Sequence, residues 1–195
     1  MPTDCEIMIV SGLPRSGTSL MMQMLAAGGI GIVTDAIRAA DTDNPRGYLE
    51  FERVKKIKQD ASWMPDARDK AIKMVSQLLR ELPPGERYRV IFMDRDLDEV
   101  LASQEKMLER LGRPAAPRDR MKAAFQVHLE ELDRWLAGQP HIAVLRVSYN
   151  ELLEDPVAQA KRVCQFLERT MDVDAMVAAV DPSLYRNRRV DPAAK

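Results

Sequence analysis

The sequence predicts an α/β fold in which helices flank a central parallel sheet, within a single domain that spans residues 1–195. Three observations indicate this fold class. Apolar runs occur at residues 7–10 and 90–93, as expected for strands buried on both faces, and a further strand is predicted at residues 142–147 (IAVLRV). Segments with helical periodicity separate these runs, which favours parallel crossover connections. The length of 195 residues suits one domain with a real core.

The first predicted strand, residues 7–10 (IMIV), leads into a loop bracketed by Gly12 and Gly17. The segment LMMQMLAA at residues 20–27 predicts a mostly buried helix, and the glycine pair after it ends the helix. A glycine loop between a strand and a helix is the context in which such a loop predicts phosphate binding.

The middle of the chain is less regular. Residues 41–47 (DTDNPRG) predict a turn and a loop. The segment GYLEFERVKKI at residues 47–57 leaves strand and helix open. Residues 70–75 (KAIKMV) are compatible with a strand, and the Pro-Pro-Gly break at residues 83–85 separates it from the strand at 90–93.

Three helices are predicted in the second half. Asp96 can cap the first, with Glu99 three residues later as in a capping box. The apolar face of this helix consists of Leu97, Val100, Leu101, Leu108 and Leu111. Beyond a surface loop at residues 113–117, a longer helix aligns Met121, Phe125, Leu129, Leu132 and Leu136. Asp155 and Pro156 then begin a helix whose face holds Val157, Ala160, Cys164 and Leu167.

Composition excludes several classes of protein. Hydrophobic residues make up 46% and charged residues 30%, which is typical of globular proteins, and a formal net charge of −1 argues against nucleic-acid binding. Cys5 and Cys164 form no CxxC pair, so we expect a reducing compartment and no metal site. Neither a signal-peptide pattern nor an apolar run of about 20 residues is present, so we expect a cytoplasmic protein without a membrane span.

The loop SGLPRSGTSL at residues 11–20 carries anion-binding chemistry. Inward-pointing backbone N–H groups of a tight loop and the N-terminus of the next helix attract anionic oxygens. Arg15 adds a fixed positive charge, and three hydroxyl groups add donors. The Walker A pattern is matched at Gly12, Gly17 and Ser19, but Thr18 replaces its Lys. That Lys contacts the β- and γ-phosphates of a nucleoside triphosphate, so its loss weakens a kinase interpretation.

GLPRSGTSL resembles the 5′-phosphosulfate loop of sulfotransferases that use 3′-phosphoadenosine 5′-phosphosulfate (PAPS). A second match supports the resemblance: VIFMDRDLDEVLAS places Arg95 at a strand end and Ser103 eight residues later, the pair that holds the 3′-phosphate in that family. A cation and a hydroxyl at these places can converge on one anion. The resemblance covers residues 7–167 and implies a P-loop nucleoside triphosphate hydrolase-like (sulfotransferase) fold in a short, bacterial-type member.

The resemblance also implies a set of donor-binding residues. In KAIKMVSQLLREL it places Lys73 beside the bridging oxygen of the donor, and in VSYNELLEDP it places Tyr149 beside the adenine. The 5′-phosphosulfate falls to the loop residues Pro14, Arg15, Ser16, Gly17, Thr18 and Ser19. PAPS is thus the expected co-substrate, without a metal, and Arg15 and Lys73 are expected to contribute to catalysis.

Two departures from the family pattern stand out. Small-molecule members carry a catalytic His two residues after the strand Lys, where this chain has Val75. The C-terminal R-K-G and W-K-N stretch that closes over the 3′-phosphate is also missing. SLYRNRR, with Arg186 and Arg188, either substitutes for it or is a solvated basic tail.

The acceptor proton needs another base. His128 and His141 fit structural positions better than catalytic ones. Tyrosylprotein and heparan-type branches of the family use a Glu soon after the first helix, and NPRGYLEFE offers Glu50 and, as second choice, Glu52. If this segment is a strand, both side chains point to one side.

The sequence therefore predicts a PAPS-dependent sulfotransferase that acts on a hydroxyl group or amine of a small molecule, lipid or peptide. Two alternatives stay open: a non-catalytic nucleotide-binding protein of the same fold, and a P-loop nucleotide or small-molecule kinase. The oligomeric state is open as well.

Overall fold

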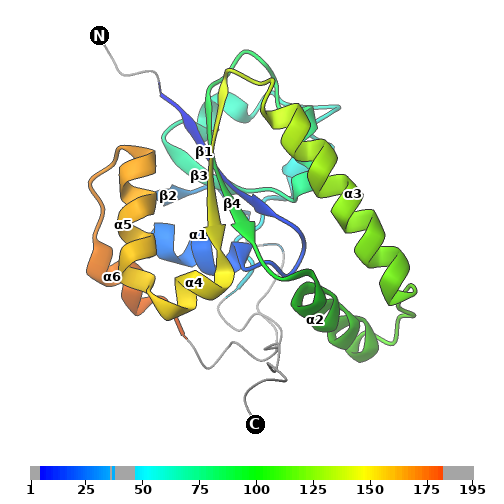
Figure 1. Ribbon diagram of the computed structural model, residues 1–195. Coiled ribbons are helices and arrows are strands. Elements are labelled where there is room, and N and C mark those ends of the chain that lie inside the picture. The colour runs from blue at the N-terminus through cyan, green and yellow to red at the C-terminus, as the bar shows by residue number, and fades with distance from the viewer. Residues whose placement is uncertain (1–4, 36, 38–46, 182–195) are drawn as a thin grey trace.

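A five-stranded, entirely parallel sheet forms the centre of the molecule, as the sequence predicts (Figure 1). The computed structural model describes residues 5–35, 37 and 47–181. The strand order is β2-β3-β1-β4-β5, which places the first predicted strand in the middle. The strands are β1 (Ile7–Gly12), β2 (Gly31–Ile32), β3 (Lys70–Lys73), β4 (Tyr88–Asp94) and β5 (Ile142–Ser148).

Helices cover both faces of the sheet. In Figure 1, α1, α5 and α6 gather on one side and α3 on the other. The helices are α1 (Thr18–Ala27), α2 (Leu97–Arg110), α3 (Arg118–Leu136), α4 (Tyr149–Glu154), α5 (Pro156–Leu167) and α6 (Val173–Ala178). Among the described residues, three 3₁₀ helices precede β4, namely η1 (Glu52–Lys56), η2 (Met64–Ala67) and η3 (Ser76–Glu81).

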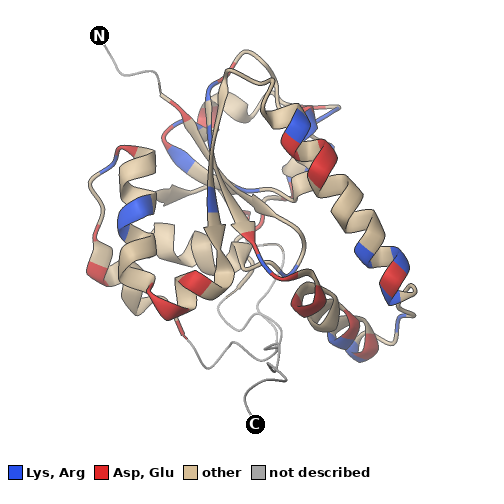
Figure 2. Ribbon diagram, viewed as in Figure 1, with Lys and Arg blue, Asp and Glu red and all other residues tan. Residues whose placement is uncertain are grey.

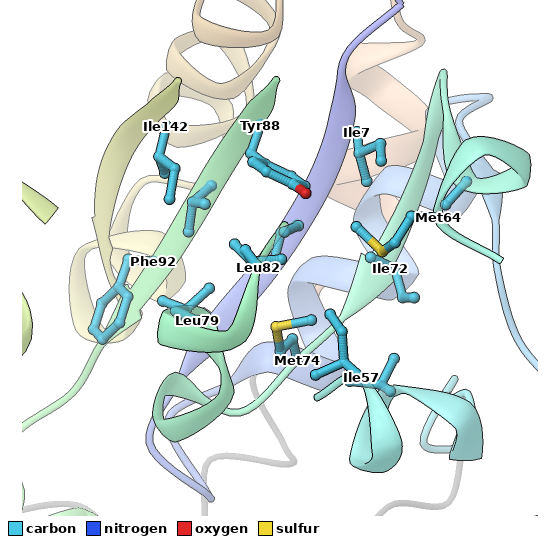
Figure 3. Packing of buried hydrophobic residues seen from close by; sticks show 14 of the residues in the cluster. Ile7, Ile57, Met64, Ile72, Met74, Leu79, Leu82, Tyr88, Phe92 and Ile142 are labelled. Atoms are coloured by element: carbon cyan, nitrogen blue, oxygen red, sulfur yellow. The ribbon is translucent and has the colours of Figure 1, made fainter. Parts of the chain in front are cut away.

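Alternation along the buried strands divides the core between the two faces of the sheet. Ile9 of β1 aligns with Ile72 of β3 and Val90 of β4, and all three belong to one cluster. Figure 3 shows this cluster, with side chains of the strands packed against those of the 3₁₀ helices. The neighbours Met8 and Val10 belong to the opposite cluster, beneath α1 and α5. Burial on both faces explains the uninterrupted apolar runs.

The sequence analysis did not predict β2, the short helices α4 and α6, or the three 3₁₀ helices. β2 has two residues and α6 has six, too few for either to show a periodicity. Two predicted helix faces also need correction. Leu111 is 57% exposed because α2 ends at Arg110, and Val157 is 43% exposed in the first turn of α5.

Residues 47–57 form no strand. Leu49 adopts φ 49°, and η1 begins at Glu52, so the alternation expected for a strand does not apply. Asp35 fixes the entry to η1, because its Oδ2 accepts a hydrogen bond of 2.6 Å from the backbone N–H of Glu52. The condition for a common orientation of Glu50 and Glu52, a strand over this segment, is therefore not met.

Charges of both signs alternate along α2 and α3 (Figure 2). No helix among residues 5–35, 37 and 47–181 combines the length and apolar character that crossing a bilayer demands.

Candidate active site

A pocket of about 800 Å³ opens where β1, β3 and β4 end. Residues from separate parts of the chain line it. They come from the glycine loop at residues 12–19 (the phosphate loop), the segment around Glu50, the end of β3, one face of α2 and Tyr149 at the start of α4. Parallel strands bring their carboxyl ends to one edge of a sheet, where ligands bind in open α/β folds. The predicted donor loop and the predicted 3′-phosphate pair thus share one cavity.

The phosphate loop depends on backbone conformations that favour glycine. Gly17 adopts φ 99°, and a Cβ atom there would lie 2.3 Å from the Tyr149 ring. Arg15 also lies in the left-handed region, with φ 71°, which is uncommon for a residue with a side chain. Thr18 and Ser19 begin α1 and line the pocket, so unpaired N–H groups of the helix N-terminus face it.

Ser16 lies differently from its neighbours. Its side chain is 1% exposed, and a Cβ atom on Gly12 would come within 2.4 Å of its Oγ atom. The hydroxyl group has no hydrogen-bond partner among the described residues. Pro14 lines the pocket, whereas Ser16 is not among the described residues that line it.

Lys73 connects the loop to the segment after the first helix. Its Nζ atom lies 2.9 Å from Oγ of Ser19, 3.1 Å from the carbonyl oxygen of Tyr48 and 3.3 Å from Oε1 of Glu50. The same ammonium group lies 5.5 Å from the centre of the Tyr48 ring. These contacts hold a cation at the end of β3, beside the loop.

The two candidate bases differ in position. Glu50 lines the pocket and its side chain is 21% exposed. Glu52 is absent from the described lining, and its Oε1 lies 2.5 Å from Nζ of Lys55 in a surface ion pair. Of the two glutamates, Glu50 is the one placed beside Lys73 and the phosphate loop.

Arg95 and Ser103 line the same pocket as the loop. Arg95 follows β4, and Ser103 lies on the pocket face of α2. Nε of Arg95 pairs with Glu99 at 3.0 Å, and both side chains are buried. The guanidinium group of Arg95 also lies 4.5 Å from the centre of the Tyr149 ring. Burial raises the pKa of Tyr149 more than the nearby Arg95 lowers it, so the phenol stays neutral.

Sequence reasoning missed Glu99 and Tyr48. The sequence places Glu99 in a capping box, and Asp96 does cap α2 by accepting from the N–H groups of Asp98 and Glu99. The spacing of four residues between Arg95 and Glu99 is the available signal for their ion pair. The hydrogen bond from Lys73 to Tyr48 uses the backbone carbonyl oxygen of Tyr48. Any residue type could supply that oxygen, so the sequence does not predict this contact.

The other residues considered in the sequence analysis lie in the pocket, outside its lining, or outside the described part of the chain. Val75 lines the pocket with 40% of its surface exposed. His128 lies outside the described lining, with Nε2 2.9 Å from Oγ of Ser76. Arg186 and Arg188 lie outside the described residues. In the part of the chain that is described, His, Cys, Asp and Glu form no group of three that could hold a metal ion.

Known structures share this fold. The sulfotransferase domain from the curacin biosynthetic pathway is 13% identical, with a TM-score of 0.50 over 95% of this chain and 78% of that one. Mouse sulfotransferase SULT7A1, solved with PAP, is 15% identical, with a TM-score of 0.52 over 91% of this chain and 63% of that one. A sulfotransferase from Alicyclobacillus acidocaldarius is 17% identical, with a TM-score of 0.51 over 93% of this chain and 89% of that one.

No curated protein matches the sequence. The family model described as the sulfotransferase domain, however, matches residues 6–195, almost the whole chain. This match agrees with the parallel sheet and flanking helices of the fold. The chain belongs to the sulfotransferase family, and it is a sulfotransferase whose acceptor is still to be identified.

Proposed function

We propose that this sulfotransferase moves a sulfuryl group from PAPS to a hydroxyl group, or an amine, of its acceptor. The family supports the reaction type, and the structural neighbour solved with PAP supports the choice of donor. The observation that carries the proposal is the position of Lys73, whose Nζ lies within 3.3 Å of both Ser19 and Glu50. A cation, the donor loop and a carboxylate thereby meet in one pocket.

Each part of the donor has a proposed partner. The loop residues from Pro14 to Ser19 hold the 5′-phosphosulfate, with Ser16 buried among them. Arg95 and Ser103 hold the 3′-phosphate and so select PAPS over ATP. Tyr149 lies beside the adenine. The C-terminal residues Arg186 and Arg188 remain predicted contacts of the 3′-phosphate.

The chemistry follows from this arrangement. The acceptor oxygen forms a bond to sulfur while the bond from sulfur to the bridging oxygen breaks, and 3′-phosphoadenosine 5′-phosphate (PAP) leaves with that oxygen. Glu50 takes the proton of the acceptor. The ammonium group of Lys73 and the guanidinium group of Arg15 stabilise the charge that develops on the leaving oxygen and the transferring group.

Apolar surface lies beside the reacting groups. Phe51, Val54, Val75 and Leu78 line the pocket next to Glu50 and Lys73. Val75 exposes apolar surface in a place where an acceptor would cover it. An acceptor with an apolar body next to its hydroxyl group suits this wall.

Incubation with radiolabelled PAPS and a panel of alcohols, phenols, amines and peptides tests the proposal. We expect the label to reach at least one class of acceptor and to stay on PAPS when Glu50→Gln replaces the native protein. Transfer of phosphate from ATP with magnesium, without any transfer from PAPS, would instead favour the kinase alternative.

A further inference from the structure

The proposed donor carries more negative charge than its proposed contacts balance. Each phosphate group of PAP brings a charge of about −1.5 to −2 at neutral pH. Among the described residues assigned to the donor, Arg15, Lys73 and Arg95 bring positive charge to the pocket. Two of these cations have a carboxylate beside them, because Lys73 lies 3.3 Å from Glu50 and Arg95 lies 3.0 Å from the buried Glu99. Their contribution to an anionic ligand is therefore partly offset.

The deficit is largest at the proposed 3′-phosphate site. At the 5′-phosphosulfate, backbone N–H groups of the loop and of the N-terminus of α1 add partial positive charge. Ser103, in contrast, lies in the interior of α2, where backbone N–H groups bond to helix carbonyl oxygens. Its hydroxyl group accepts a hydrogen bond of 3.0 Å from Nε of Arg15 and can donate to a phosphate oxygen at the same time. A dianion beside Ser103 thus calls for further cations nearby.

The pocket face of α2 carries two such cations. Lys106 and Arg110 line the pocket together with Ser103. They follow Ser103 at three and seven positions, which places all three residues on one face of the helix. Lys55 also lines the pocket, but it does so from η1, where Glu52 pairs with it at 2.5 Å.

The Arg110 side chain runs back along α2 towards Ser103. Its Nε atom donates a hydrogen bond of 3.2 Å to the carbonyl oxygen of Lys106, one turn closer to the serine. Helical side chains lean towards the helix N-terminus in general, so the Lys106 side chain leans towards Ser103 as well. Lys106 follows Ser103 by about 4.5 Å along the helix axis. Both side chains thereby bring positive charge towards an anion held at Ser103.

Glu109 is the acidic neighbour of this pair. It also lines the pocket, but it lies about 120° from Ser103 around the helix axis. Lys106 and Arg110 lie within about 60° of Ser103. Positive charge therefore dominates on the side of α2 that carries the serine.

We propose that Lys106 and Arg110 bind the 3′-phosphate together with Arg95 and Ser103, and that they determine the preference for PAP and PAPS over nucleotides without this group. The inference rests on the proposed function, because it assumes a donor with a 3′-phosphate. The two cations match the charge of a phosphate dianion, and the planar guanidinium group of Arg110 offers donors with the geometry of a phosphate.

Affinities for PAP and 5′-AMP, measured by calorimetry, test this role, because 5′-AMP lacks the 3′-phosphate. The variants are Lys106→Gln, Arg110→Gln and their combination. An exposed ion pair is worth a few-fold in affinity, so we expect the double variant to bind PAP roughly tenfold more weakly. Its affinity for 5′-AMP stays within about twofold of the native value. Added salt weakens PAP binding less in the double variant, because two screened attractions are gone.

Two controls separate charge from other effects of substitution. Lys106→Arg combined with Arg110→Lys keeps both charges and is expected to keep most of the affinity for PAP. Lys122→Gln removes one positive charge from α3, outside the described pocket lining, and leaves the ratio of the PAP and 5′-AMP affinities unchanged. If the double variant is unstable, the two single variants carry the same comparison.

The possible outcomes distinguish the inference from the proposed function. Unchanged PAP affinity in the variants overturns the inference, and so does an equal loss of affinity for PAP and 5′-AMP. Both results leave the proposed function in place. Failure of the native protein to bind PAP overturns the proposed donor and the inference with it.

Discussion

Nζ of Lys73 and Oε1 of Glu50 lie 3.3 Å apart, and their side chains are 10% and 21% exposed. The two groups face the same pocket from different segments, Lys73 from the end of β3 and Glu50 from the chain before η1. In the proposed reaction the ammonium group stabilises the charge on the leaving oxygen, and the carboxylate takes the proton of the acceptor. Because the two groups are close together, bond breaking at the donor and proton removal at the acceptor occur beside each other.

Substitution of Glu50 tests the proposed base. Glu50→Gln keeps the size of the side chain but cannot take a proton, so we expect turnover to fall by roughly 10²–10⁴-fold. The affinity for PAP is expected to stay within a few-fold of the native value. Glu52→Gln is the matched control, because Glu52 is not among the residues that line the pocket and pairs with Lys55 rather than with Lys73. Near-normal rates of labelled transfer in Glu50→Gln would remove this carboxylate from the mechanism.

Substitution of Lys73 separates catalysis from binding. Charge on the bridging oxygen grows as the bond to sulfur breaks, so Lys73→Ala should lower kcat more than the affinity for PAP. Arg95→Ala should show the opposite balance, because the 3′-phosphate is remote from the transferring group. Calorimetry and steady-state rates on the two variants check this division, and an equal loss of PAP affinity in both would contradict it.

The 3′-phosphate assignment predicts a ranking of ligands. PAP should raise the Tm of the protein more than 5′-AMP or ATP at equal concentration, because Arg95 and Ser103 gain a partner with PAP alone. A ligand at a hundred times its Kd adds about 2.7 kcal/mol to the free energy of unfolding. Thermal denaturation with the three nucleotides is the measurement, and equal shifts with PAP and 5′-AMP would count against the assignment.

The pair between Arg95 and Glu99 predicts a stability effect. The side chains are 7% and 3% exposed, so removal of either partner leaves a charge buried without its counterion. Typical losses for such single substitutions are about 3–5 kcal/mol, whereas replacing both partners by apolar groups of similar size often restores much of the loss. Urea denaturation of Arg95→Met, Glu99→Leu and the double variant checks this, and a purely additive double variant would be evidence against coupling.

His128 predicts a pH dependence of folding stability. Burial, with a smaller contribution from Arg80 and a partial offset from Glu131, holds its pKa below the ordinary value. Between that lowered pKa and about 6.5, the unfolded chain binds a proton that the folded chain does not, so stability falls as the pH drops through this window. Tm measured from pH 7.5 to 5 should fall less steeply in His128→Gln, and parallel curves would show that another group is responsible.

The sequence predicts one half of the site better than the other. Arg95 follows the end of a strand and Ser103 lies in the next helix. Because a helix advances by a fixed rise per residue, the spacing of these residues in the sequence predicts where they lie in the structure. The Glu50 segment has no such regularity, because it depends on positive φ at Gly47 and Leu49 and on the contact between Asp35 and the backbone of Glu52. The sequence therefore does not predict that Glu50 lies close to Lys73. It also does not predict the hydrogen bond between Arg15 and Ser103, which are 88 positions apart.

The central place of β1 determines how firmly the start of the loop that follows it is attached to the sheet. β1 is hydrogen-bonded to β3 on one side and β4 on the other, and the phosphate loop begins where it ends. Amide hydrogens of a strand paired on both sides exchange with solvent mainly when the whole domain opens, whereas chain ends and edge strands open far more often. The first residue of the loop is therefore attached to the slowest-opening part of the molecule, and this attachment is lost only when the whole domain unfolds.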